Sequence, residues 1–186
     1  CIRDRTLGYF HNRGYYELSG EDYDGVLRVG HADSSLPPYA EVVNLSRRQR
    51  PDAVTLRKRV DELVVQHLQR RPTSNPIDRL SAQIDADLAW LQNQVPETFH
   101  GYAFGTLRQC GAWAEMASSF TAWLGEPDLA ESVTSFARLS ETAKACQFKL
   151  ARAARGRTAD LTGEFRTMSR CWTEAYQPLL DRYACG

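Results

Sequence analysis

The stretch from Pro96 to Leu124 reads PETFHGYAFGTLRQCGAWAEMASSFTAWL and decides the fold class of this chain. Its apolar and small residues recur in alternating steps of four and three, which is the spacing of one face of an α-helix. A proline followed directly by a glutamate is typical of the first turn of a helix. We therefore predict one long helix whose inner face carries Phe99, Ala103, Thr106, Cys110, Trp113, Ala117, Phe120 and Leu124.

Similar patterns on both sides of this stretch predict four further helices. Pro51, Pro76 and Pro127 each stand at a plausible first helical position. A connection as short as Gly125-Glu126 favours antiparallel neighbours. Residues 51–185 therefore predict an antiparallel bundle of about five helices. The other four are expected over Val54–Leu68, Ile77–Val95, Leu129–Leu150 and Leu161–Tyr183.

The first 46 residues are different, because they are rich in glycine, tyrosine and turn residues. Arg5 to His11 and Tyr15 to Leu18 predict two strands joined by a turn, and Glu41 to Leu45 predicts a third. Two or three strands are marginally stable on their own and need a larger sheet or a helical face. The fold class is therefore mainly α, with a small N-terminal β element that belongs to something larger.

Charge is balanced over the chain but unevenly distributed along it. The 23 Lys and Arg residues equal the 23 Asp and Glu residues, so net charge favours neither a nucleic-acid nor a membrane partner. Residues 47–71, however, hold eight basic residues against three acidic ones, a net charge of +5. A solvated helix face is the plainer interpretation. The alternative is an acidic partner bound through Arg47, Arg48, Arg50, Arg57, Lys58 and Arg59.

The five cysteines are odd in number and show no metal-ligand spacing, so no metal site is predicted. Cys110, Cys146 and Cys171 fall on the predicted helices, where a cysteine commonly acts as a small buried residue. A reduced, cytoplasmic protein is the best interpretation. His100 precedes Cys110 by ten residues on one helix, which separates them by about 15 Å and excludes a catalytic dyad.

Polar residues gather in the first part of the long helix. His100, Tyr102 and Arg108 are candidate substrate-binding residues, because they can line a pocket that faces the β part, with Arg108 holding a carboxylate or a phosphate. Gly101 and Gly105 stand four residues apart and would let a neighbouring backbone approach. The plainer alternative is a tightly packed helix start whose polar groups satisfy one another.

His11 and Asn12 end the first long strand and are the candidate catalytic residues. In papain-like folds one strand carries the catalytic histidine, and the next ends in an Asn or Asp that orients it. A strand that ends in His-Asn fits the last part of such a site. The alternative is that Asn12 is only a turn residue.

Six blocks of the sequence stand out: LGYFHNRGYYELSGEDYDG (7–25), LPPY (36–39), RPTSNP (71–76), ETFH (97–100), TLRQ (106–109) and KACQFKLA (144–151). Together they resemble the bacterial domain-of-unknown-function family 1839, DUF1839. The resemblance implies a cysteine-peptidase-like α/β half followed by a helical half, with the candidate Cys and His upstream of Cys1. We therefore expect this chain to be a C-terminal portion: 1–46 as a β-rich tail, 47–75 as basic linker and helix, and 76–186 as helical bundle.

The family resemblance also implies a function. Its members are encoded beside amino acid:carrier protein ligases and small carrier proteins, so we expect aminoacyl or acyl transfer involving a thioester on the phosphopantetheine arm of a carrier protein. Carrier proteins are acidic, which gives the basic segment a role in docking. The alternative is a non-catalytic helical module that binds an acidic partner. Nucleic-acid binding is least favoured, because no aromatic residues interleave the basic block.

Overall fold

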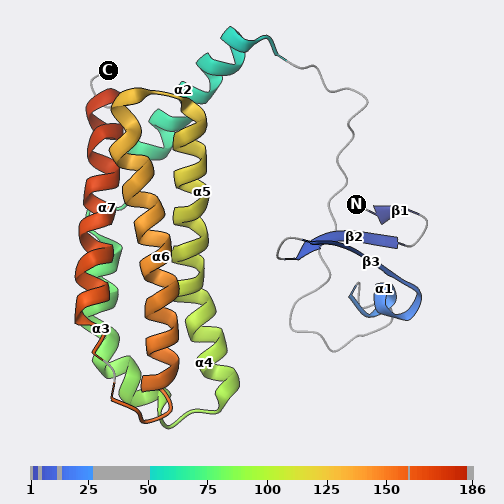
Figure 1. Cartoon of the computed structure of the whole chain (residues 1–186), viewed down its shortest axis with the longest axis vertical. Coiled ribbons are helices and arrows are strands. Elements are labelled where there is room, and N and C mark those ends of the chain that lie inside the picture. Colours follow the sequence, from blue (N-terminus) through green and yellow to red (C-terminus); the bar gives the residue numbers. More distant parts are fainter. Residues whose placement is uncertain (1, 4–5, 12–13, 27–50, 159, 184–186) are drawn as a thin grey trace. The chain divides into compact units, whose positions relative to one another are not determined.

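The structure is a computed structural model of the chain, and it describes residues 2–3, 6–11, 14–26, 51–158 and 160–183 (Figure 1). Backbone packing divides the chain into two compact units, residues 1–50 and residues 51–186. Within the described residues, strands are confined to the first unit and most of the chain is helical. The predicted class, mainly α with a small N-terminal β element, is therefore confirmed.

The described part of the N-terminal unit is an antiparallel sheet followed by a short helix. Its strands are β1 (Ile2–Arg3), β2 (Thr6–His11) and β3 (Gly14–Ser19), and its helix is α1 (Gly20–Val26). Leu7 lies opposite Leu18, and Tyr9 lies opposite Tyr16. The two long strands were predicted to within one residue at each end. The strand predicted at residues 41–45 lies outside the described residues.

The helical unit consists of five helical rods, where a rod is one uninterrupted stretch of helix. Three consecutive helical elements join end to end and count as a single rod. The rods α5, α6 and α7 lie side by side, with α6 between the other two (Figure 1). The elements are α2 (Ala53–Gln69), α3 (Pro76–Leu91), the continuous run α4 (Pro96–Ala103), η2 (Phe104–Arg108) and α5 (Gln109–Leu124), then η3 (Pro127–Leu129), α6 (Ala130–Ala153) and α7 (Thr162–Tyr183).

The helix starts follow their capping residues. Asn75 accepts a hydrogen bond from the Ile77 amide and places Pro76 in the first turn, as predicted. Pro51 stands differently: Asp52 is the N-cap of α2 and accepts from the Thr55 amide at 2.9 Å, so Pro51 precedes the cap. The carboxylate of Asp52 caps the Thr55 N–H group, which a proline side chain cannot do, and this explains the offset.

A π-helical turn shifts the buried face of the long rod away from the predicted one. The turn, η2, spans Phe104–Arg108 and holds more residues than an α-helical turn. As a result Leu107, only 1% exposed, takes the core position expected for Thr106. Trp113 and Phe120, predicted to be buried, are both partly exposed. The simple alternation of four and three fails because it assumes an unbroken α-helix.

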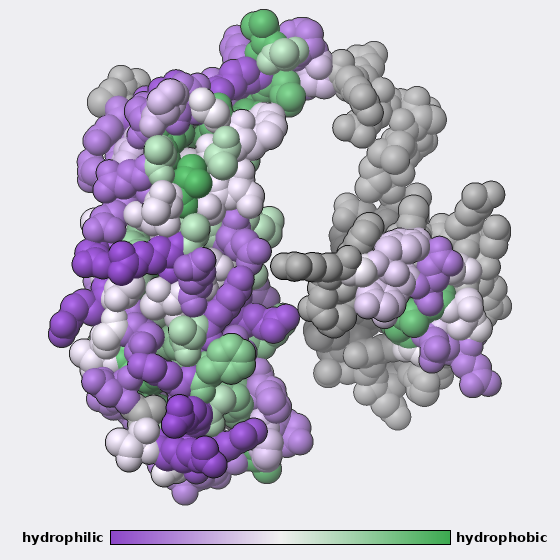
Figure 2. Space-filling model, viewed as in Figure 1, coloured by the Kyte–Doolittle hydropathy of each residue, from purple (hydrophilic) through white to green (hydrophobic). Residues whose placement is uncertain are grey.

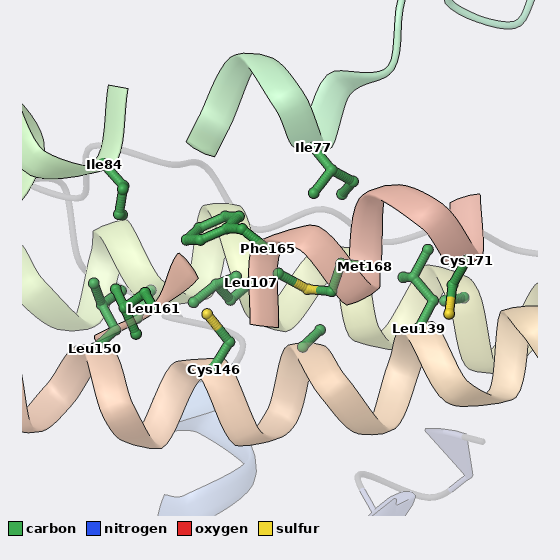
Figure 3. Packing of buried hydrophobic residues seen from close by; sticks show 13 residues of the cluster. Ile77, Ile84, Leu107, Leu139, Cys146, Leu150, Leu161, Phe165, Met168 and Cys171 are labelled. Carbon is green, nitrogen blue, oxygen red and sulfur yellow. The ribbon is translucent and has the colours of Figure 1, made fainter. Parts of the chain in front are cut away.

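The core of the helical unit is made where α3, α6 and α7 meet the long rod. Figure 3 shows Ile77 and Ile84 of α3 above Phe165 and Met168 of α7, with Cys146 of α6 below them. A second cluster joins α2 to α7 through Val64, Leu68, Leu124, Leu129, Phe136, Ala175 and Leu179. The helix of the predicted 47–75 segment therefore packs on the bundle through this second cluster.

The surface of the helical unit is largely hydrophilic on the face drawn in Figure 2, with hydrophobic residues scattered between polar ones. Among the described helices, none has the length and apolar content required to span a bilayer.

Candidate functional site

The predicted catalytic pair lies at the end of β2. His11 is the last residue of this strand, and its backbone lies opposite Gly14 at the start of β3. Asn12 lies outside the described residues. The sheet thus places His11 at the tip of the β2–β3 hairpin, and the catalytic role of the pair stays a prediction.

Tyrosines pack over the same hairpin. The rings of Tyr9 and Tyr16 lie 5.7 Å apart across the two strands. The Tyr15 ring covers Gly8 of the neighbouring strand so closely that a Cβ atom there would collide with it. Aromatic cross-strand contacts of this kind stabilise a short sheet and fix its register. Gly8 therefore leaves room for the Tyr15 ring to pack across the two strands.

Of the three predicted substrate-binding residues, Tyr102 is partly buried and points to α3. Its hydroxyl donates a hydrogen bond to Oδ2 of Asp87 at 2.7 Å. Burial, and with it the hydrogen bond to this carboxylate, raises the pKa of Tyr102 far above its ordinary value. A phenol so engaged joins α4 to α3, and its hydroxyl is committed to that contact.

His100 and Arg108 occupy the outer face of the same rod. Both are exposed, and together with Phe104 they stand four residues apart, so they share one face. The His100 ring meets the Phe99 ring edge-on at 5.7 Å between centroids. The structure therefore groups His100 with Arg108 and separates both from the Tyr102 hydroxyl.

The glycines of this face do not serve the packing predicted for them. At both Gly101 and Gly105 an added Cβ atom would meet only open space. The glycine that brings two helices together is Gly111, where a Cβ atom would lie 3.5 Å from Ala143 Cβ and from the Ser140 carbonyl oxygen. The π-helical turn moves the helix contact onto Gly111, one more position that regular periodicity missed.

The described cysteines are core residues, as predicted. Cys146 and Cys171 are fully buried and Cys110 is partly buried, all as free thiols. Burial raises the pKa of Cys110 to about 11, and burial together with the nearby Glu164 carboxylate raises that of Cys146 to about 12. A thiol with such a pKa is protonated at neutral pH, so these cysteines are poor nucleophiles.

An ion pair beside Cys146 was not predicted. Lys149 Nζ lies 2.7 Å from Oε1 of Glu164, which joins α6 to α7. The second carboxylate oxygen, Oε2, is buried without a hydrogen-bond partner among the described residues. The two residues lie on different helices, and no sequence spacing connects them. The pair forms a partly buried polar site at the edge of the core.

The basic segment is divided between internal and exposed charges. Arg57 donates from Nη1 to the Leu124 carbonyl oxygen at 2.8 Å and from Nη2 to Oε1 of Glu126 at 2.6 Å. Arg182 of α7 also reaches Glu126, at 2.7 Å. Arg57 therefore holds α2 to the bundle. Lys58 and Arg59 are exposed, whereas Arg47, Arg48 and Arg50 lie outside the described residues.

One small polar hollow lies between α3 and the start of α7. Its volume is about 120 Å³, and Asp85, Asp160 and Thr162 supply polar groups to its walls. Oδ1 of Asp160 accepts a hydrogen bond from the backbone N–H of Thr162 at 2.9 Å. In the described part of the chain, no group of three or more His, Cys, Asp and Glu residues is placed to hold a metal ion.

Comparison with known families connects these two units to defined domains. Residues 53–181 match the DUF1839 C-terminal domain, and residues 1–45 match the DUF1839 N-terminal domain. The chain belongs to the DUF1839 family. No match to it was found among curated proteins or among solved structures.

The DUF1839 domains coincide with the two structural units. The C-terminal domain begins at residue 53, the first residue of α2, and the helical unit begins at residue 51. His11 belongs to the DUF1839 N-terminal domain, whereas His100, Tyr102 and Arg108 belong to the C-terminal one. The predicted catalytic and substrate-binding residues are thus carried by different domains of the family.

Proposed function

We propose that this DUF1839 protein takes part in the transfer of an aminoacyl or acyl group from a thioester on a carrier protein. The N-terminal domain supplies the bond-making groups, and the helical domain binds the carrier. The observation that carries this division is the state of the described thiols, which are buried and have raised pKa values. Attack on a thioester requires a thiolate, so the helical domain serves binding.

In this proposal His11 and Asn12 stand beside the reacting groups. A cysteine thiolate, which the resemblance places upstream of Cys1, bonds to the thioester carbonyl carbon. The phosphopantetheine thiol of the carrier leaves and takes a proton from the active-site histidine. A nucleophilic acceptor then gives its proton to the histidine, bonds to the acyl carbon and expels the cysteine thiolate. Asn12 orients the histidine, as the corresponding residue does in papain-like sites.

The exposed basic residues support docking of an acidic carrier. Lys58 and Arg59 are free to meet a partner, whereas the guanidinium of Arg57 is used within the helical domain. Complementary charge raises the association rate and selects the partner more than it adds affinity. His100 and Arg108 form a second exposed site for the carrier or its arm, and Tyr102 positions that face by its bond to Asp87.

The second candidate function is a non-catalytic module that binds an acidic protein. It is favoured by the same exposed Lys58 and Arg59 and needs no reaction at His11. Under either function we place the protein in the cytoplasm, because reduced cysteines persist in a reducing compartment.

The test uses protein expressed from its complete reading frame and a carrier protein loaded with a radiolabelled aminoacyl group. We expect loss of label from the carrier, slowed about 100-fold by Asn12→Ala or His11→Ala. Asn93→Ala is the matched control, because Asn93 is exposed just after α3 and its side-chain amide donates to the carbonyl oxygen of Ala89 in that helix. Carrier that stays loaded but binds in a salt-sensitive manner would favour the non-catalytic module.

A further inference from the structure

Helix α5 carries a row of large apolar side chains on its outer side. Trp113 is 41% exposed, Met116 72%, Phe120 43% and Trp123 57%. Steps of three, four and three residues place the four side chains on one stripe, with the spacing of a helix-pairing seam. The rings of Phe120 and Trp123 stack at 6.1 Å, and the Trp113 ring stacks on Tyr176 at 6.3 Å. The stripe is therefore an ordered surface.

Most of the stripe lies off the α6 side of α5; Trp113 borders α6, where its ring meets the Phe136 ring edge-on at 5.5 Å between centroids. On the α6 side of α5, the Ser118 hydroxyl donates to the Val133 carbonyl oxygen at 2.9 Å, and Gly111 packs against Ala143. Helix α5 lies at the edge of the row that it forms with α6 and α7 (Figure 1). Within the helical unit, the outer side of α5 is therefore left largely exposed.

The stripe is symmetric about residue 118. Trp113 and Trp123 are equally distant from this position, and so are Met116 and Phe120. A twofold axis there would set Trp113 against the partner's Trp123 and Met116 against the partner's Phe120. Self-complementarity of this kind is the requirement for an interface between two identical chains. We propose that α5 pairs antiparallel with α5 of a second copy of this chain.

Charge favours a second copy as the occupant of this face. Glu115 is the only ionisable residue of α5 other than its cysteine, and Lys144 of the same chain lies 2.9 Å from its carboxylate. Pairing two copies therefore brings no unpaired like charges together. An acidic carrier protein would find no basic side chain along the stripe.

Area and shape also agree with a second copy. At about 200 Å² for each large side chain, the exposed fractions give roughly 400 Å² per copy, the size of a functional surface patch. The pair then buries roughly 850 Å² from these residues alone, which predicts a weak, reversible dimer. Beside Met116 lies a shallow hollow of about 490 Å³ lined by Ala112, Glu115 and Ser119, which receives the partner's Phe120.

The test is sedimentation velocity of the full chain over a range of about 1 to 200 µM, because a weak dimer depends on concentration. We expect the mass to rise from 21.0 kDa toward twice that value. Met116→Glu should weaken the dimer at least about tenfold, since it sets a charge against the partner's Phe120. Phe148→Glu on α6 is the matched control, because Phe148 is equally exposed and lies off the stripe.

A charge exchange tests the register. Phe120→Lys alone should also be monomeric, whereas a mixture of Met116→Glu and Phe120→Lys proteins should form a heterodimer. Circular dichroism checks that each variant is folded, and Met116→Glu decides the question alone if Phe120→Lys does not fold. A chain that stays monomeric at every concentration, or a dimer unaffected by Met116→Glu, would overturn the proposal. This pairing does not depend on the proposed function.

Discussion

The hydroxyl of Tyr102 donates to Oδ2 of Asp87 at 2.7 Å and joins α4 to α3 in the helical domain. This bond fixes the rod whose opposite face presents His100 and Arg108. The Tyr102→Phe substitution removes the hydroxyl donor, so the Asp87 carboxylate loses this hydrogen bond. We expect a loss of about 1 kcal/mol in the free energy of unfolding, measured by urea denaturation. A urea denaturation curve of Tyr102→Phe with unchanged midpoint and unchanged slope would contradict the stabilising role of this hydrogen bond.

The buried thiols should be unreactive in the folded protein. Cys146 and Cys171 are fully buried, and burial raises the pKa of Cys146 to about 12. We expect neither thiol to react with a thiol-specific reagent at neutral pH until urea unfolds the chain. Rapid labelling of Cys146 in the folded state, located by mass spectrometry, would refute the burial that underlies the proposed function.

The same thiols predict an alkaline loss of stability. In the unfolded chain the Cys146 thiol ionises near pH 9, whereas in the folded chain it stays protonated until about pH 12. The contribution of the protonated, buried Cys146 thiol to the stability of the folded chain is therefore fully present below about pH 9 and is lost as pH rises toward 12. Between about pH 8 and about pH 10, ionisation of this thiol in the unfolded chain should lower the free energy of unfolding by about 1 kcal/mol. Urea titrations of Cys146→Ala should show a smaller decrease; an equal one would contradict the assignment.

The glycines of the long rod should respond oppositely to substitution. Gly101 has open space at its Cβ position, so Gly101→Ala should stabilise the helix by about 0.5–1 kcal/mol. Gly111 already lies against Ala143 and Ser140, so Gly111→Leu should destabilise by about 1–3 kcal/mol. Thermal unfolding of the two variants measures both effects. A stabilising Gly111→Leu would place the α5–α6 contact elsewhere.

Arg57 should hold the first half of α2 in place. Its bonds to the Leu124 carbonyl oxygen and to Glu126 are lost in Arg57→Ala. We expect faster amide hydrogen exchange in residues 53–60 and a loss of about 1 kcal/mol, small because the side chain is partly solvated. Lys58→Ala, next along the same helix and exposed, is the control and should leave exchange unchanged. Equal rates of amide hydrogen exchange in Arg57→Ala and Lys58→Ala would contradict the role of Arg57 in holding α2.

Much of the fold was predictable from local patterns, because most helices here keep their period and begin at recognisable caps. Pro76 and Asn75 mark the start of α3, and Ile77 and Ile84 fall on its buried face as expected. The strands β2 and β3 were likewise predictable from β-forming residues on either side of a turn. Regular periodicity failed at η2, where the backbone leaves α-helical geometry and Leu107 is buried in place of Thr106. It also failed at Val95, which was predicted on the helix over Ile77–Val95 but is 60% exposed and lies beyond the end of α3.

The candidate site was less predictable, because its contacts join residues far apart in the chain. The sequence indicates that Tyr102 and Arg57 are polar residues on helices, but their partners Asp87 and Glu126 come from other elements. Tertiary packing alone selects these partners. The same holds for Lys149 and Glu164. Tyr102 was predicted to line one pocket with His100 and Arg108, but its hydroxyl bonds to Asp87, and the other two residues are exposed.

The most direct test of the central claim is steady-state kinetics of label release from an aminoacylated carrier protein, with complete protein in three forms. We expect Asn12→Ala to lower kcat with little change in KM, because it acts on the bond-making groups. The combined Lys58→Glu and Arg59→Glu change should raise KM, more at low salt, with kcat kept. Equal rates in all three proteins, or no release by any of them, would contradict the account.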